Sequence, residues 1–180
     1  MKNKNFFGEI DNIILKEYDS EYPKKYQEEV ALLRSKLPDR QCAFHHIGST
    51  AVPNILSKPI IDIAVELERF PLKQDEIEAL ENLGYRYWNS NPNENHHFFF
   101  KNLPRTHHLH VRPTGAEKLA RELRFRDRLL KDDKLKRQYE ELKKSLAENY
   151  ATDRETYTEM KSEFINSVLQ MDDAPNLKSG

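Results

Sequence analysis

The residue types best suited to chemistry lie between His45 and Glu66. The turn Gly48-Ser49-Thr50 offers clustered backbone N–H groups and two hydroxyls, a combination that can hold phosphate oxygens. The chain has only five glycines, so a glycine at this position indicates a backbone requirement and not a compositional habit. The turn therefore predicts a phosphate-binding segment with Ser49 as a candidate catalytic group.

Asp62 follows the turn in a predicted strand over residues 59–67. Apolar residues alternate there with Asp62, Ala64 and Glu66, so these three side chains are expected on one face of the strand. Asp62 and Glu66 are about 13 Å apart at the usual rise per strand residue, too far to chelate one ion easily. Asp62 is therefore the candidate metal ligand and catalytic carboxylate.

His108 and His110 lie two residues apart in a second predicted strand, with Cα atoms roughly 6.5 Å apart on one face. Two imidazoles at that separation can share a metal ion with a carboxylate from a neighbouring strand. Asp62, His108 and His110 could thus form a two-histidine, one-carboxylate site. The alternative, that both histidines only hydrogen-bond to polar neighbours, carries equal weight.

Cations that could contact phosphate occur near these residues and further along the chain. Lys58 precedes Asp62 by four residues and could reach the rim of the site or remain solvated. Lys161 falls inside the apolar stripe of a predicted helix, where a lysine needs a charged partner or a path for its ammonium group to reach water, so it is a candidate for pairing with an acidic group or a phosphate. His46, directly before the turn, could contact phosphate or make an ordinary hydrogen bond.

Hydrophobic periodicity predicts the elements that position these residues. A cap at Asp19 or Ser20 and a proline in the first turn predict a helix that ends at Pro38, and Thr152 is expected to cap the last helix. Gly84 predicts a left-handed helix end. The other predicted helices cover 75–83, 116–131 and a segment from 132 or 133 to 150, and the predicted strands cover 43–47, 59–67, 85–88, 96–101 and 106–111.

Length and composition favour one soluble domain. The 180 residues can bury about 70% of their unfolded surface in a single core. A net charge of −1 argues against general nucleic-acid binding. A single cysteine, Cys42, and the absence of a signal peptide or a membrane-length apolar run favour a reduced, cytoplasmic setting. We expect an N-terminal arm over 1–12, one domain over 13–170 and a solvated tail over 171–180.

Several segments, in order, resemble one protein family. "HIGSTAVPNILSKPIIDI" is similar to the core of the GrpB family, which is nucleotidyltransferase-like and related to the polymerase-beta-like superfamily. "EYDSEYP", "RTHHLHV", "FRDRLL" and "YTEMKSEFI" also resemble family segments. The resemblance implies an α+β fold: a mixed β-sheet of four to five strands, with helices packed on one face and a C-terminal helical layer.

The resemblance also implies a site and a reaction. Gly48 and Ser49, with Thr50, would hold phosphate, Asp62 would bind a divalent metal, and Arg105 would anchor substrate. The superfamily places a second carboxylate where this chain has Ala64, which puts two-metal catalysis in doubt. The implied activity transfers a nucleotidyl group from a nucleoside triphosphate to an unknown acceptor, using Mg²⁺ or Mn²⁺, or Zn²⁺ or Fe²⁺ if the histidines bind the metal.

Two other functions fit the same residues. The missing carboxylate at Ala64 supports a catalytically degenerate module that binds a nucleotide and acts in regulation. A single-metal phosphoester hydrolase could instead use Asp62, His108 and His110. For each of these functions a monomer or a homodimer, without membrane association, is expected.

Overall fold

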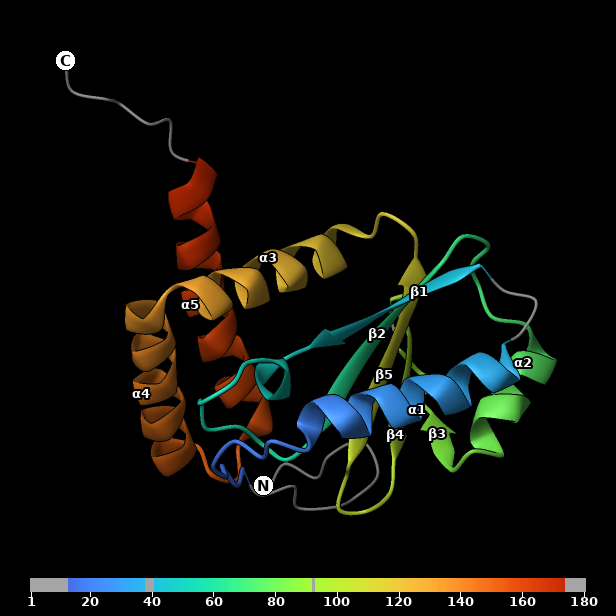
Figure 1. Ribbon diagram of the computed structural model, residues 1–180, viewed down its shortest axis with the longest axis horizontal. Helices are drawn as coiled ribbons and strands as arrows, with labels where there is room; N and C mark the ends of the chain where they lie inside the picture. Colours follow the sequence, from blue (N-terminus) through green and yellow to red (C-terminus); the bar gives the residue numbers. More distant parts are fainter. Residues whose placement is uncertain (1–12, 38–40, 92, 174–180) are drawn as a thin grey trace.

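A computed structural model describes residues 13–37, 41–91 and 93–173 of the chain. Within this part, five strands form one mixed sheet and five α-helices pack around it (Figure 1). The predicted arm over 1–12, the helix-ending Pro38 and most of the predicted tail lie outside the described residues. The predicted α+β fold with a mixed sheet is confirmed.

The sheet brings together strands that are distant in sequence. Its order is β1-β2-β5-β4-β3, with β2 and β5 parallel and all other neighbours antiparallel. The parallel pair lies at the centre, so residues of β2 and β5 that face the same side become neighbours. The strands are β1 (Cys42–Ile47), β2 (Ile61–Leu67), β3 (Tyr85–Tyr87), β4 (His97–Lys101) and β5 (His107–Pro113).

The helices agree with the predicted ones except at their ends. Glu21, not Asp19 or Ser20, is the N-cap residue of α1, although Asp19 accepts a hydrogen bond from the Glu21 N–H. Asp153, not Thr152, caps α5 by accepting from the N–H of Thr156. The helical elements are α1 (Tyr22–Lys36), the 3-10 turn η1 (Ser49–Ala51), α2 (Gln74–Glu81), α3 (Glu117–Lys131), α4 (Asp133–Asn149) and α5 (Arg154–Asp173).

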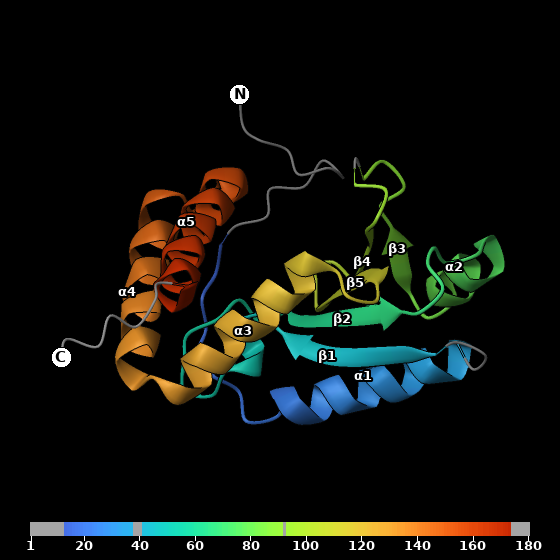
Figure 2. The same ribbon diagram turned by 90° about the horizontal axis from the view of Figure 1, so that it is seen from above.

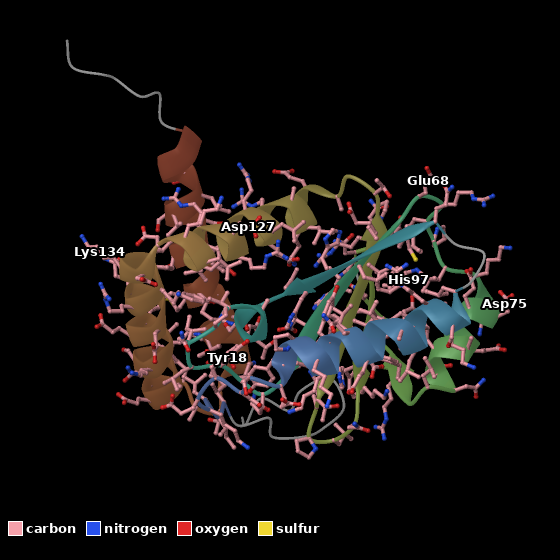
Figure 3. All side chains as sticks on the ribbon, in the orientation of Figure 1. Tyr18, Glu68, Asp75, His97, Asp127 and Lys134 are labelled. Atoms are coloured by element: carbon pink, nitrogen blue, oxygen red, sulfur yellow. The ribbon has the colours of Figure 1, made fainter. Side chains whose placement is uncertain are left out.

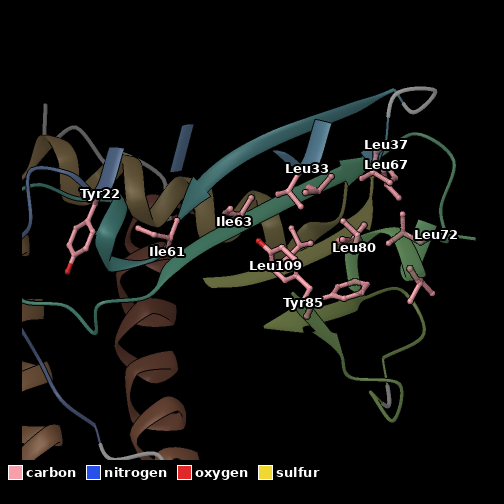
Figure 4. Close-up of a cluster of buried hydrophobic side chains, with 14 residues drawn as sticks. Tyr22, Leu33, Leu37, Ile61, Ile63, Leu67, Leu72, Leu80, Tyr85 and Leu109 are labelled. Atoms are coloured by element: carbon pink, nitrogen blue, oxygen red, sulfur yellow. The ribbon is translucent and has the colours of Figure 1, made fainter. Parts of the chain in front are cut away.

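Helices α1 and α2 cover one face of the sheet (Figure 2). Ile61 and Ile63 of β2 pack there against Leu33 of α1 and Leu80 of α2, in the cluster shown in Figure 4. Burying each such side chain contributes roughly 1.5–3 kcal/mol. Because side chains alternate along a strand, this apolar face leaves Asp62 on the opposite one.

Helices α3, α4 and α5 form the predicted C-terminal layer (Figures 1 and 2). Helices α4 and α5 lie beyond one end of the sheet, whereas α3 begins on the sheet, where Leu119 packs against Ile47 and Ala64. Phe125, Tyr139 and Val168 pack in this layer against Val52 and Ile55, which follow the 3-10 turn. The Gly-Ser turn is therefore held between the sheet and the helical layer. Helix α5 continues to Asp173 and so includes residues 171–173 of the predicted tail.

Charged side chains cover the outer surface. Asp75 of α2 and Lys134 of α4 are both exposed (Figure 3). Among the described residues, no helix combines the length and the apolar character needed to cross a membrane.

Candidate functional site

Asp62, His108 and His110 lie side by side on the sheet face opposite α1. Asp62 pairs in register with His108, and Ala64 with His110, across the parallel strands β2 and β5. The His108 Nδ1 and Asp62 Oδ1 atoms are 2.8 Å apart, at hydrogen-bonding distance. One ligand atom from each of the three residues lies within 4.8 Å of the other two. The predicted convergence of these side chains is therefore present.

Gly48 makes close contact with the carboxylate of Asp62. The antiparallel pairing of β1 and β2 places Ile47 opposite Asp62, so the turn begins directly beside the carboxylate. Gly48 has a φ of +71°, and a Cβ atom at this position would overlap an Asp62 carboxylate oxygen. Glycine is thus required for both its backbone conformation and its missing side chain.

The protonation states at neutral pH suit metal binding. Burial acts to raise the pKa of Asp62, but the hydrogen bond with His108 and the charges of His108, His110 and Lys58 lower it to about 2. Burial, helped by the charge of Arg112, holds the pKa of His110 well below its usual value. An ionised carboxylate and a neutral imidazole are the forms that bind a metal ion.

The three ligand atoms lie close enough to bind one metal ion once the side chains move toward one another. In a tetrahedral site with ligands about 2.1 Å from the metal, two ligand atoms are about 3.4 Å apart. The atoms here lie within 4.8 Å of one another, so the widest pair would have to approach by up to about 1.4 Å. Imidazole ligands suit Mn²⁺, Fe²⁺ or Zn²⁺ better than Mg²⁺, which prefers oxygen ligands.

A second layer of side chains holds the ring of His110. The Nε2 atom of His96 lies 3.0 Å from Nδ1 of His110, and the two rings are stacked. Asn91 in turn donates to the backbone carbonyl of His96 at 2.7 Å and lies 3.1 Å from its Nδ1. Phe98 packs against the rings of both His108 and His110. The hydrogen bond to His96 fixes the orientation of the His110 ring, and binding of a metal ion through its other nitrogen requires Nδ1 of His110 to carry the proton.

The three residues open into a cavity of about 340 Å³ between the sheet and the helical layer. Glu122, one of its acidic residues, is paired with buried Arg112 at 2.7 Å, so that charge is already compensated. Among the described lining residues, the lysines outnumber the carboxylates by four to two, so the cavity favours an anion. The lysines are Lys58, Lys118, Lys143 and Lys161.

Lys143 of α4 was not predicted as a site residue. It is 2% exposed, and its Nζ donates to the Ser49 hydroxyl at 3.3 Å and to the backbone carbonyl of Leu56. Burial and the nearby charge of Lys161 lower the pKa of Lys143 to about 7. Lys143 follows Tyr139 by four residues on the apolar stripe of α4, the same sequence signal that identified Lys161.

Lys58 and Lys161, both predicted from the sequence, line the same cavity. Their Nζ atoms lie 5.5 Å and 4.5 Å from the ring centroid of Tyr157. Arg105 lies elsewhere: it lines a smaller cavity of about 160 Å³, which adjoins the first through Lys58. Its guanidinium group packs 4.6 Å from the centroid of the Phe100 ring.

His46 and the Thr50 hydroxyl lie outside the cavity lining. His46 occupies the α1 side of the sheet, where it stacks on Tyr26 at 4.7 Å. The Thr50 hydroxyl donates to the Ile60 carbonyl at 3.1 Å and so accepts from His46 Nε2 at 3.0 Å. Any contact of Thr50 with phosphate would therefore use its backbone N–H.

Comparison with known proteins gives consistent matches along most of the chain. Residues 12–171 match the family described as GrpB protein. A UPF0157 protein of Pseudomonas aeruginosa is 38% identical over 164 residues, which cover 88% of this chain and 67% of the relative. The glutamate-rich protein GrpB of Alkalihalophilus pseudofirmus is 31% identical over 163 residues, which cover 87% of this chain and 94% of the relative.

A solved structure has a similar fold. The crystal structure of GrpB from Enterococcus faecalis superposes with a TM-score of 0.75 at 30% sequence identity. The match covers 88% of this chain and 96% of that one. The sheet and the helical layer that frame the cavity thus belong to a shared architecture.

Proposed function

Because this chain belongs to the GrpB family, we propose that it is a metal-dependent nucleotidyltransferase, which transfers a nucleotidyl group from a nucleoside triphosphate to an acceptor. One observation carries the proposal: the Asp62 carboxylate lies against the backbone of Gly48, beside Ser49, in a cavity lined by lysines. This arrangement supports the proposal because it brings the candidate metal ligand next to the candidate phosphate-binding turn.

The turn and the lysines would bind the triphosphate. The backbone N–H groups of the turn and the Ser49 hydroxyl would hold phosphate oxygens. Lys58 and Lys161 would neutralise negative charge that develops during transfer.

Asp62, His108 and His110 would hold one divalent metal ion. When bound, the metal would neutralise charge on the phosphate under attack. Among the described residues, no carboxylate is placed to bind a second metal ion here, because Ala64 stands at the position of the second carboxylate and Glu66 binds other groups. The Glu66 oxygens lie 3.0 Å from His45 Nε2 and 3.2 Å from the Gly115 N–H. The residues present therefore support a one-metal reaction.

A release assay tests this function. The protein is incubated with each of the four labelled ribonucleoside triphosphates and Mn²⁺ or Mg²⁺, and pyrophosphate release is followed. We expect release that is lost in Asp62→Asn and unchanged in Asp75→Asn, an exposed acidic residue of α2. If no triphosphate binds at millimolar concentration, the proposal is wrong.

The donor set of two histidines and one carboxylate also favours a second function, hydrolysis of a phosphoester by a single bound metal. Such a site would retain Zn²⁺, Mn²⁺ or Fe²⁺ through purification. Metal analysis of the purified protein, combined with release of inorganic phosphate from p-nitrophenyl phosphate, separates the hydrolase from the transferase. Nucleotide binding without any turnover would instead indicate a degenerate regulatory module.

A further inference from the structure

Lys143 is a buried cation that the proposed reaction has not yet used. Burying an amine with 2% exposure costs free energy unless the group gains strong partners. The protein supplies polar partners and the face of an aromatic ring: the Ser49 hydroxyl, the Leu56 carbonyl and the Tyr139 ring, whose centroid lies 4.8 Å from Nζ. These contacts hold the nitrogen at the Gly-Ser turn and in the wall of the cavity.

The number of N–H donors on Lys143 depends on its charge. A neutral amine has two N–H groups, and the Ser49 and Leu56 oxygens use two. An ammonium group has three, so protonation adds one donor for a ligand in the cavity. Binding of an anion and binding of a proton at Lys143 are therefore coupled.

The groups around Lys143 come from several elements. Lys161 of α5 disfavours its charge, whereas Glu140 of α4 favours it. The same cavity also contains the following titratable groups: Lys58, Asp62 of β2, His108 and His110 of β5, Lys118 and Glu122 of α3, and Tyr157 of α5. A negatively charged ligand placed among the lysines would shift this balance toward the ammonium form.

We propose that Lys143 binds the pyrophosphate portion of the nucleoside triphosphate, in a site completed by Ser49, Lys58 and Lys161, and that it takes up a proton when this ligand binds. The inference rests on the proposed transferase function and assigns its leaving-group site. Lysines contributed by α4, α5 and the segment before β2 converge on one cavity, which fits a compact, multiply charged anion better than a single phosphate.

During transfer, the acceptor oxygen would form a bond to the α-phosphorus and lose its proton to solvent. The bond from the α-phosphorus to the bridging oxygen would break, and pyrophosphate would leave with the electron pair. The additional N–H of protonated Lys143 would stabilise the charge on this leaving group.

Calorimetric titration of inorganic pyrophosphate in the presence of Mg²⁺ tests the site. Measurements at pH 8 in buffers with different ionisation enthalpies give the number of protons taken up. Lys143→Met should bind about 10- to 100-fold more weakly, as expected for the loss of one charged hydrogen bond. Wild type should take up about one more proton than Lys143→Met, since a lysine of pKa about 7 is mostly neutral at pH 8.

Two further variants control for folding and for charge. Lys134→Met removes an exposed lysine from the same helix and should bind as wild type does. Lys143→Arg keeps a permanent charge and should bind pyrophosphate without the extra proton uptake. This variant also provides the comparison if Lys143→Met fails to fold, as judged by thermal unfolding.

The outcomes distinguish this inference from the proposed function. If Lys143→Met binds pyrophosphate within twofold of wild type, or if Lys143→Arg keeps the extra proton uptake, the inference is wrong. If wild type binds a nucleoside triphosphate but not pyrophosphate, the leaving-group site is wrong and the transferase proposal stands. If wild type binds neither, both are wrong.

Discussion

The contact between Gly48 and Asp62 shows how one missing side chain permits the candidate site. The carboxylate occupies the space that a Cβ atom at Gly48 would fill. A φ of +71° adds a backbone cost for any other residue. Both effects predict that a substitution at Gly48 disturbs Asp62 directly.

We expect Gly48→Ala to reduce both stability and metal binding. Gly48 combines a φ of +71° with a ψ of −171°, a conformation that costs a non-glycine residue about 1–3 kcal/mol, and the overlap with the carboxylate must displace Asp62 from its contact with His108. Urea unfolding measures the first effect and calorimetric Mn²⁺ titration the second.

Gly115→Ala is the matched control, because Gly115 has a φ of +77° and no atom within 4 Å of the position of an added Cβ. The Gly115→Ala protein should also lose free energy of unfolding through its backbone conformation, but its affinity for Mn²⁺ should be unchanged. Equal Mn²⁺ affinities for the two variants would contradict the importance of the Gly48 contact.

His96 is expected to position the metal ligand His110. Loss of a hydrogen bond to a ligating histidine typically weakens metal affinity 10- to 100-fold, so His96→Ala should show a loss of this size. His97→Ala serves as the control, because His97 packs instead against Tyr87 and Phe70. A His96→Ala protein that binds Mn²⁺ as tightly as wild type would rule out the positioning role.

Local patterns identified some of these residues and missed others. Alternation along two strands was enough to place His108 and His110 on one face, and a lone glycine before Ser49 marked the turn. Periodicity could have placed Lys143 on the apolar stripe of α4, but its contact with Ser49 and the contact of His96 with His110 join distant segments, which periodicity does not contain. The sequence could not predict which cavity Arg105 lines or which face of the sheet His46 occupies, because both depend on how whole strands pair.

At the scale of elements, a buried ion pair connects α1 to the sheet. Glu29 of α1 is 5% exposed, and its carboxylate oxygens lie 3.0 and 3.1 Å from Nζ of Lys101 on β4. His107 of β5 lies 3.8 Å from the same carboxylate. The pair lies on the face opposite Asp62 and therefore affects stability and not the candidate site.

We expect Glu29→Ala to lower the free energy of unfolding by roughly 2–3 kcal/mol, because it leaves the partly buried Lys101 ammonium without its carboxylate. The double variant Glu29→Met with Lys101→Met should recover most of this loss, since it removes both charges and keeps apolar volume. Urea unfolding compares the two. A single variant as stable as wild type would show that the pair contributes little.

The order of the elements was predictable, whereas some of their ends were not. Apolar residues at helical or alternating spacing marked each helix and strand, and Gly84 marked the end of α2 with a φ of +90°. The caps differed by one or two residues. Asp153 is as suitable a cap as Thr152, whereas Glu21 occupies the N-cap position of α1 without a side-chain cap hydrogen bond. Which helices cover which face depends on packing between elements and required the structure.

The whole molecule should lose stability on mild acidification, in part through His46. Burial, opposed by Asp62 and reinforced by Arg126, lowers the pKa of His46 to about 4, below the ordinary 6.5 of the unfolded chain. The unfolded state therefore binds more protons between these values, so the contribution of neutral His46 is complete above pH 6.5 and is lost as the pH falls to 4.

Urea unfolding at a series of pH values measures this effect. His46 should add a slope of at most about 1.4 kcal/mol per pH unit between pH 4 and 6.5. His46→Gln should show a correspondingly smaller slope while it keeps a hydrogen-bonding group near Thr50. Identical slopes for the two proteins would show that His46 titrates normally in the folded state.

One metal ion and one triphosphate are proposed to bind together in the cavity between the sheet and the helical layer. Anomalous diffraction from crystals soaked with Mn²⁺ and a non-hydrolysable nucleoside triphosphate tests it most directly. We predict an anomalous peak bound by Asp62, His108 and His110, with the triphosphate at Ser49 and Lys143. A peak at other residues, or a triphosphate bound outside this cavity, would contradict the account.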